Sequence, residues 1–195
     1  MNDHSLPTIP RTEPATLRDG SAVLIRPVSP ADAALLADGF TRLSPESRRL
    51  RFLTAKDELR PAELRYLTEV DHHDHEAIGA LDAADGRGVG IARYIREAAA
   101  PETAEIAVTV VDGWQGRGLG TELVTRLAER ARQAGIRRFV ALTAGGNVAM
   151  GMLLRRMGGT VLHREFGTLE YELPLGPPAE VAPADMAPAL ATQGS

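Results

Sequence analysis

The chain has 195 residues, of which 44% are hydrophobic and 25% are charged, and its formal net charge is −4 at pH 7 with a sequence pI near 5.8. These values are typical of one globular domain with a sizeable core. The acidic balance argues against a nucleic-acid partner, which normally requires a basic surface. The absence of cysteine excludes disulfides, thiolate zinc sites and a cysteine nucleophile. No secretory h-region and no run of about 18 apolar residues occur, so we expect a cytoplasmic protein with no membrane partner.

The N-terminal half of the chain predicts hairpins and helices. Asp19-Gly20 is a strong hairpin turn signal, and Ser44-Pro45 has the form of an N-cap followed by proline at the first helical position. Apolar residues recur at helical spacing on both sides of this cap and change to strand spacing from Glu76. The expected elements are two strands within 16–26, helices over 31–43, 45–52 and 61–70, strands over 76–83 and 89–97, and a loop over 98–102.

The C-terminal half predicts a strand–helix–strand unit followed by another helix and a hairpin. The expected elements are a strand over 105–111, a helix from Leu119 that is closed by Gly135, a strand over 138–143, a helix over 147–157, and strands over 160–166 and 168–173. This order predicts an α/β fold around a mixed, mostly antiparallel sheet. We expect one domain over 15–173, with disordered segments over 1–14 and 174–195 because both are proline-rich and lack periodicity.

The turn between the strand at 105–111 and the next helix is the strongest functional signal in the chain. Gly116, Gly118 and Gly120 remove side chains at a helix start, where backbone N–H groups and the helix dipole favour an anion such as phosphate. A Walker loop is excluded because no Gly-Lys-Ser/Thr tripeptide occurs. A dinucleotide fingerprint would need a third glycine where Thr121 stands and an acidic residue about 20 positions later, and neither is present.

The remaining pattern, Q-x-x-G-x-G after a strand that carries an acid, resembles the acetyl-CoA pyrophosphate loop of the GNAT superfamily of N-acetyltransferases. The resemblance extends from about Thr16 to Leu173 and is most specific over 105–158. Within the superfamily the sequence is most similar to the bacterial protein-lysine acetyltransferase (Pat-like) branch. Three segments carry this similarity: RLSPESR with LRF in the early helices, VDHHDH before the strand at 76–83, and residues 147–158. The resemblance implies the GNAT fold, with helices on both faces of the sheet, and acetyl-CoA as co-substrate.

The resemblance also implies which residues bind acetyl-CoA. The backbone N–H groups of the turn would hold the pyrophosphate, with Arg117 meeting phosphate from the side. The strand end would pair with the pantetheine arm, and the Val110 N–H would polarise the thioester carbonyl. Asn147 matches an asparagine placed against the pantetheine, and it is equally a helix N-cap. The implied set is Val110, Val111, Gln115, Gly116, Arg117, Gly118, Leu119, Gly120, Thr121 and Asn147, and no metal is expected.

Transfer to an amine also needs a base, because a lysine amine has a pKa near 10.4 and deprotonating it at pH 7 costs about 4.6 kcal/mol. Glu105 is the candidate, since it is an acid in an otherwise apolar strand and Ala104-Glu105-Ile106 is similar to the Ala-Glu-Ile of histone-modifying GNAT enzymes. The alternative is a carboxylate that is solvated or paired with Arg93 or Arg96. Leu154 stands where many relatives carry a tyrosine as general acid, which leaves the general acid unassigned.

The expected function is acetyl transfer from acetyl-CoA to a primary amine, with a protein lysine as the expected acceptor, by direct attack in a ternary complex. The alternatives are acetylation of a small amine and a non-catalytic acyl-CoA-binding regulator. The oligomeric state is not indicated. The His-rich segment 71–75 is interpreted as a solvated loop rather than a zinc site. The arginines of the early helices form either an exposed basic face or a guide for acidic substrates: Arg42, Arg48, Arg49 and Arg51. Arg155 and Arg156 are either solvated or in contact with the 3′-phosphate of the cofactor.

Overall fold

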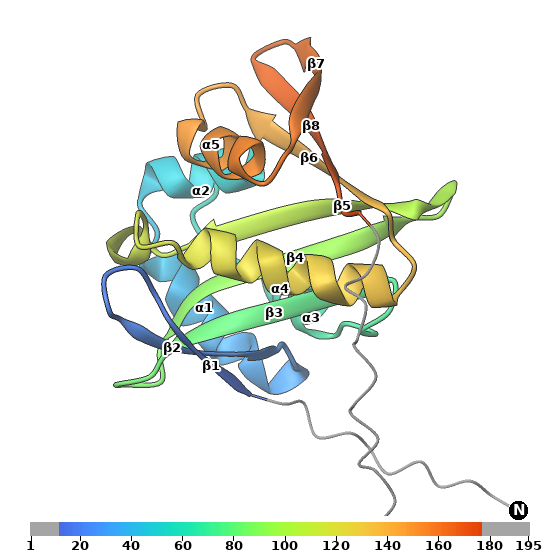
Figure 1. Ribbon diagram of the computed structural model, residues 1–195. Coiled ribbons are helices and arrows are strands. Elements are labelled where there is room, and N and C mark those ends of the chain that lie inside the picture. The colour runs from blue at the N-terminus through green and yellow to red at the C-terminus, as the bar shows by residue number, and fades with distance from the viewer. Residues whose placement is uncertain (1–11, 177–195) are drawn as a thin grey trace, which may run out of the picture.

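A computed structural model describes residues 12–176, and the parts of the two expected disordered segments at 1–11 and 177–195 lie outside the described residues. Within this range eight strands form one sheet in the order β1-β2-β3-β4-β5-β6-β8-β7 (Figure 1). Every neighbouring pair is antiparallel except β5 with β6. The prediction of a mixed, mostly antiparallel sheet is therefore confirmed.

The elements follow the predicted order with small shifts at their ends. The strands are β1 (Glu13–Thr16), β2 (Ala22–Pro27), β3 (His75–Asp82), β4 (Gly88–Glu97), β5 (Ala100–Val110), β6 (Arg138–Ala144), β7 (Thr160–Glu165) and β8 (Thr168–Pro174). The helices are α1 (Ala33–Thr41), α2 (Pro45–Phe52), α3 (Pro61–Thr68), α4 (Leu119–Gln133) and α5 (Val148–Arg156), with short 3-10 turns η1 (Pro30–Asp32) and η2 (Asp112–Trp114).

The segment 98–102, which was expected to be a loop, belongs mostly to β5. Glu97 pairs with Ala100, and a register shift between Arg96 and Glu97 lets the β4–β5 hairpin turn within Ala98 and Ala99. The register shift is a β-bulge, an irregularity that ladder pairing tolerates and that residue alternation alone does not predict. The hairpin is consequently longer than expected.

Helices cover both faces of the sheet. In Figure 1, α4 crosses in front of β3, β4 and β5, whereas α1 and α3 lie behind them. The core lies mainly under α4, where Tyr94 and Phe139 have ring centroids 6.0 Å apart. The apolar residues of α4 that were expected at helical spacing are buried there: Leu119, Leu123, Val124, Leu127, Ala128 and Ala131. None of the helices within residues 12–176 is long and apolar enough to cross a membrane.

The strands β5 and β6 separate after a short parallel contact. They pair only from Thr103 to Glu105 on β5, with Arg138 to Val140 on β6. Beyond this point β6 continues along β8, and the edge of β5 that faces β6 has no strand partner. The separation opens the sheet at its centre, next to the glycine turn.

Secondary structure and core residues are found slightly beyond the expected domain limits of 15 and 173. The strand β1 begins at Glu13. At the other end, Leu175 is only 4% exposed, and its N–H donates to the Arg137 carbonyl oxygen at 2.9 Å. Residues beyond 173 therefore contribute to the core.

Candidate active site

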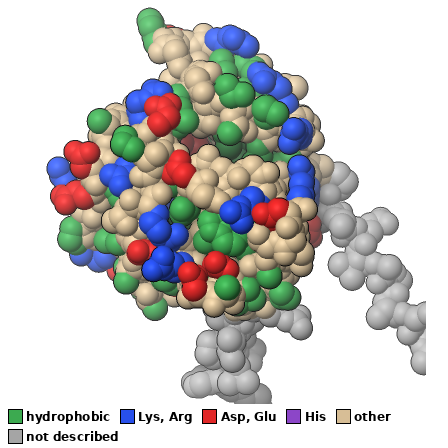
Figure 2. All heavy atoms as spheres, turned by 90° about the vertical axis from the view of Figure 1, so that its left-hand side faces the viewer, with side chains coloured by type: hydrophobic (Ala, Val, Ile, Leu, Met, Phe, Trp, Pro, Cys, Tyr) green, Lys and Arg blue, Asp and Glu red, His purple; other side chains and the backbone are tan. Residues whose placement is uncertain are grey.

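A groove of about 710 Å³ follows the opening between β5 and β6. The glycine turn and Asn147 line it on one side, and Glu105 and Arg51 also line it. The wall between them is β5 from Ile106 to Val110, a length of about 17 Å at the usual rise per residue. Figure 2 views the end of the molecule that carries the turn and α2, and it shows a hollowed face on which basic, acidic and hydrophobic side chains alternate.

The glycine turn presents backbone N–H groups to this groove. Gly116 and Gly118 have φ angles of 75° and 95°, a left-handed conformation that favours glycine. Gly118 is the N-cap of α4 and provides no side-chain cap, and the first helical hydrogen bond runs from the Glu122 N–H to the Gly118 carbonyl oxygen at 3.1 Å. The preceding N–H groups, from Leu119 to Thr121, have no partner within the helix. Such a helix start is suited to an anion.

Gly120 has a different role from the other two glycines. A Cβ atom at this position would lie 2.9 Å from Leu153 Cδ1, which belongs to α5. The absence of a side chain at Gly120 therefore permits the close contact between α4 and α5. Gly120 thus has a packing role in addition to its position on the groove, and its part in phosphate binding stays a prediction.

Arg117, which was expected to meet phosphate, does not line the groove. Its guanidinium lies 3.3 Å from Asp19 Oδ2, donates to Ser21 Oγ at 3.1 Å and lies 4.8 Å from the centroid of the Trp114 ring. These contacts attach the turn to the β1–β2 hairpin. Arg18 of the same hairpin lines the groove instead, with its Cγ and Nε atoms 3.3 Å from the Cβ position of Gly118. Sequence reasoning missed Arg18, and no local motif marks it.

Val110 and Val111 present their backbone groups to opposite edges of β5. The Val111 N–H donates to the carbonyl oxygen of Val89 on the neighbouring strand β4 at 3.0 Å. Because successive residues of a strand point their N–H groups to opposite edges, the Val110 N–H points into the opening toward β6. Of the two residues, Val110 lines the groove and Val111 does not, and the pairing of both with a pantetheine arm stays a prediction.

Gln115 and Asp112 connect the turn to α2. Gln115 Nε2 donates to the Val110 carbonyl oxygen at 3.1 Å and to Ser47 Oγ at 3.2 Å. The Asp112 carboxylate accepts from the Ser44 N–H at 2.7 Å, from Ser44 Oγ at 2.9 Å and from Ser47 Oγ at 2.7 Å. Burial acts to raise the pKa of Asp112, but these hydrogen bonds outweigh it and the pKa is lowered. The carboxylate is thus a stable acceptor at neutral pH.

The helix α5 contributes the groove wall opposite β5. Asn147 lines the groove, and its Oδ1 atom accepts from the Met150 N–H at 3.1 Å, so it is the N-cap of α5. Leu154 is fully buried in the core, and its neighbour Leu153 lines the groove. A side chain at position 154 therefore points away from the groove, and the general acid stays unassigned.

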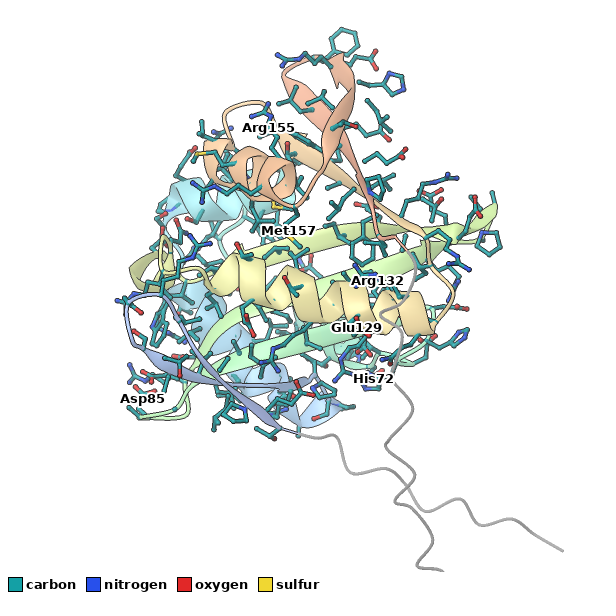
Figure 3. All side chains as sticks on the ribbon, viewed as in Figure 1. His72, Asp85, Glu129, Arg132, Arg155 and Met157 are labelled. Carbon is teal, nitrogen blue, oxygen red and sulfur yellow. The ribbon has the colours of Figure 1, made fainter. Side chains whose placement is uncertain are left out.

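The two arginines at the end of α5 lie apart. Arg156 lines the groove, whereas the Arg155 guanidinium lies 5.6 Å from the centroid of the Tyr171 ring (Figure 3). Of the two candidates for a cofactor phosphate, only Arg156 is placed on the groove.

Glu105 lies on the face of β5 that α1, α2 and α3 cover, and it is exposed to the groove. The predicted alternatives of an ion pair with Arg93 or Arg96 are not found. Arg96 pairs with Asp74 at 2.6 Å, and Arg93 donates to the Leu67 carbonyl oxygen at 2.9 Å. Among the residues from 12 to 176 Glu105 forms no salt bridge, so its carboxylate is accessible from the groove.

The His-rich loop is organised by hydrogen bonds rather than around a metal. Asp71 Oδ1 accepts from the N–H groups of His73, Asp74 and His75, each at 2.9 Å. His72 Nδ1 lies 2.7 Å from an oxygen of Glu76. No group of three or more potential ligand side chains is arranged for a metal in the part of the chain that the structure describes.

The four arginines that were expected to form one basic face are dispersed. Arg42 pairs with Asp38 at 2.9 Å and Arg49 pairs with Glu46 at 2.8 Å. Arg48 donates to backbone oxygens and lies 4.5 Å from the centroid of the Phe40 ring. Only Arg51 lines the groove.

Comparison with known proteins identifies the family. The family profile described as "Acetyltransferase (GNAT) domain" matches residues 22–160. The chain belongs to the GNAT acetyltransferase family. The match covers the glycine turn, Glu105 and most of the sheet, so the expected GNAT fold and the assignment to an acyltransferase family are confirmed.

Three similar proteins illustrate this family membership. The acetyltransferase Pat of Mycolicibacterium smegmatis is 34% identical over 170 residues, which are 87% of this chain and 50% of that protein. The acetyltransferase PA5475 of Pseudomonas aeruginosa is 39% identical over 147 residues, 73% of this chain and 77% of that protein. The crystal structure of the GNAT domain of S. lividans PAT matches with a TM-score of 0.79 and 29% identity, covering 84% of this chain and 96% of that one. The chain spans only half the length of the Mycolicibacterium relative.

Proposed function

We propose that this chain transfers the acetyl group of acetyl-CoA to a primary amine, specifically the side chain of a protein lysine, with Glu105 as general base. The observation that carries the proposal is the continuity of the groove, which joins the uncapped start of α4 to the accessible carboxylate of Glu105 along the free edge of β5. The protein-lysine assignment rests on the resemblance of the sequence to the bacterial protein-lysine acetyltransferase branch. Glu105 as base is supported by its position and by the absence of an ion pair in residues 12–176.

The proposed reaction begins with both substrates in the groove. The N–H groups at the start of α4 would bind the pyrophosphate, and Arg18 adds a positive charge beside Gly118. The Val110 N–H would hold the thioester carbonyl oxygen, where negative charge develops as the amine attacks. A backbone donor is suited to this task because it is already oriented by the sheet.

The proton and electron balance assigns one task to Glu105. Glu105 accepts one proton from the acceptor ammonium, and the neutral amine that results attacks the thioester carbonyl carbon. The carbon–sulfur bond then breaks, CoA leaves as a thiolate, and the second proton of the nitrogen passes to solvent. A thiol pKa near 8.5 allows the thiolate to leave without a proton donor from the protein, which agrees with the buried position of Leu154.

The substitution Glu105→Gln tests the proposed base. We expect kcat/KM for amine-dependent CoA release to fall by about 10²- to 10⁴-fold. The control is Glu102→Gln, on the same strand, because Glu102 is 58% exposed and lies 3.2 Å from Arg138 outside the groove. Rates of both variants are compared with the parent chain from about pH 6 to 9. Equal rates for Glu105→Gln and the parent across this range mean that Glu105 is not the base.

The acceptor class is tested separately by incubating cell lysate with labelled acetyl-CoA and the purified chain. Label in proteins at lysine residues supports the protein-lysine assignment. Label confined to small molecules contradicts it and favours a small-amine acetyltransferase. If calorimetry detects CoA binding but no acceptor is labelled, the chain is an acyl-CoA-binding protein without transfer activity.

A further inference from the structure

Arg93 is a buried arginine of β4 that has no acidic partner within residues 12–176. Arg93 is 4% exposed, donates to the Leu67 carbonyl oxygen at 2.9 Å and has His75 Nε2 at 3.1 Å from Nη1. Burial, followed by the charge of Arg51, lowers the pKa of Arg93 to about 10. Among residues 12–176 no carboxylate forms a salt bridge with it. Burying a cation without a counter-ion costs free energy, so a negatively charged group that comes close to Arg93 would be stabilised by its charge.

Arg51 connects this buried charge to the groove. It lines the groove together with Glu105, and it also lines the smaller apolar cavity of about 90 Å³ that Arg93 lines under α1, α2 and α3. Its guanidinium lies 4.9 Å from the centroid of the Phe52 ring and forms no hydrogen bond or salt bridge with residues of the described part of the chain. Burial lowers the pKa of Arg51, and the charge of Glu105 opposes this effect.

The sheet register places Arg93 close to Glu105 on one face of the sheet. Arg93 is opposite Ala107 and Ile95 is opposite Glu105 in the β4–β5 pair. Arg93 and Glu105 are therefore diagonal neighbours on the same face, at a separation of about 7–8 Å for such pairs. Two guanidinium groups accompany one carboxylate, which leaves a net positive charge where the acceptor amine must approach.

This charge balance selects among acceptors. An ammonium group that approaches Glu105 is repelled by the two guanidiniums, and the repulsion is only partly screened in a half-buried groove. A carboxylate on the same acceptor offsets the repulsion if it reaches Arg51, which has free donors for a charge-assisted hydrogen bond.

We propose that Arg51, with Arg93 behind it, forms a subsite for a carboxylate that the acceptor carries close to its reacting amine. The proposal rests on the proposed function and narrows its substrate class to amines with an adjacent anionic group. The carboxylate can come from an acidic residue next to a lysine in a protein or from the α-carboxyl group of a free amino acid. Arg93 is a positioning residue here, since it lines the cavity and not the groove.

The test compares matched acceptors with the unmodified protein. One pair consists of lysine peptides that differ only in an Asp or an Asn beside the lysine, and a second pair consists of free amino acids and their carboxamides. We expect kcat/KM to favour the carboxylate member of at least one pair by about tenfold or more. The pair that shows the preference identifies the source of the carboxylate. The preference should also decrease as salt is raised, because the contact is partly exposed to solvent.

The substitution Arg51→Gln should reduce the carboxylate preference toward one. Arg49→Gln is the matched control, because Arg49 lies on the same helix, is 53% exposed and pairs with Glu46 at 2.8 Å away from the groove. A preference that persists in Arg51→Gln overturns the assignment. If Arg51→Gln does not fold, the acceptor pairs still test the subsite with the unmodified chain. Equal rates within both pairs overturn the subsite but leave the proposed function intact. No transfer to any amine overturns both proposals.

Discussion

At the level of single residues, the glycine turn combines two kinds of constraint. Gly118 must adopt a φ of 95°, and Arg18 lies against it, so a side chain here is both strained and crowded. Gly113, in the same turn, has open space around its Cβ position. The two glycines therefore allow a matched comparison.

The substitution Gly118→Ala should lower the free energy of unfolding by about 1–2 kcal/mol, because an L-residue is disfavoured in the left-handed region. It should also weaken CoA binding, since the N–H groups at the start of α4 would shift. Denaturant unfolding and calorimetry with CoA measure the two effects. Gly113→Ala should leave both quantities near those of the parent, and an equal loss in the two variants would contradict the account.

Single residues also show the limit of motif reasoning at the site. Glu105 could be found because an acid interrupts an apolar strand. The turn could be found because three glycines precede a helix. The roles of Arg117 and Arg18, in contrast, could not be distinguished from the sequence. Arg117 contacts Asp19 and Ser21, and this depends on how the β1–β2 hairpin packs on the turn. No spacing rule contains this information.

At the level of secondary structure, α2 is attached to the turn by the side chain of Asp112. The carboxylate accepts three hydrogen bonds from Ser44 and Ser47 at the start of the helix, and the same helix carries Arg51 into the groove. The position of the proposed acceptor subsite thus depends on a contact at the cofactor end of the groove.

The substitution Asp112→Ala should release the start of α2 and lower the free energy of unfolding by about 1–3 kcal/mol. Amide hydrogen exchange should become faster in α2 and stay unchanged in β7 and β8, which are remote from the contact. Because the pKa of Asp112 is lowered, the contact is present at neutral pH and is lost only as the pH falls through that lowered pKa, in the acid range below the usual pKa of an aspartate. Unchanged exchange in α2 would contradict the tether.

At the level of the whole molecule, the core extends to the last described residues. The Leu175 side chain is buried, its N–H donates to the Arg137 carbonyl oxygen, and its carbonyl oxygen accepts from Arg132 Nε at 2.5 Å. Arg132 also lies 3.3 Å from Glu129, and both project from the C-terminal half of α4, far from the glycine turn (Figure 3). The end of β8 is therefore joined to the helix that begins at the site.

The substitution Leu175→Ala should lower the free energy of unfolding by about 2–5 kcal/mol, as expected for a large-to-small change in a core. Leu162→Ala is the control, because Leu162 is 43% exposed on β7, and it should change stability by no more than about 0.5 kcal/mol. Thermal or denaturant unfolding of the two variants measures the difference. Similar stabilities for both variants would place Leu175 outside the cooperative core.

The sequence by itself determined the elements, their order, the mixed sheet, the glycine turn and the acid of β5. These features follow from spacing within about 20 residues, where local geometry dictates which side chains share a face. Only the tertiary structure decided that β5 and β6 separate after Glu105, that Arg18 rather than Arg117 lines the groove, and that Arg51 lines both the groove with Glu105 and the cavity with Arg93. Such contacts join residues far apart in the chain, and they depend on the packing of whole elements rather than on local sequence preference.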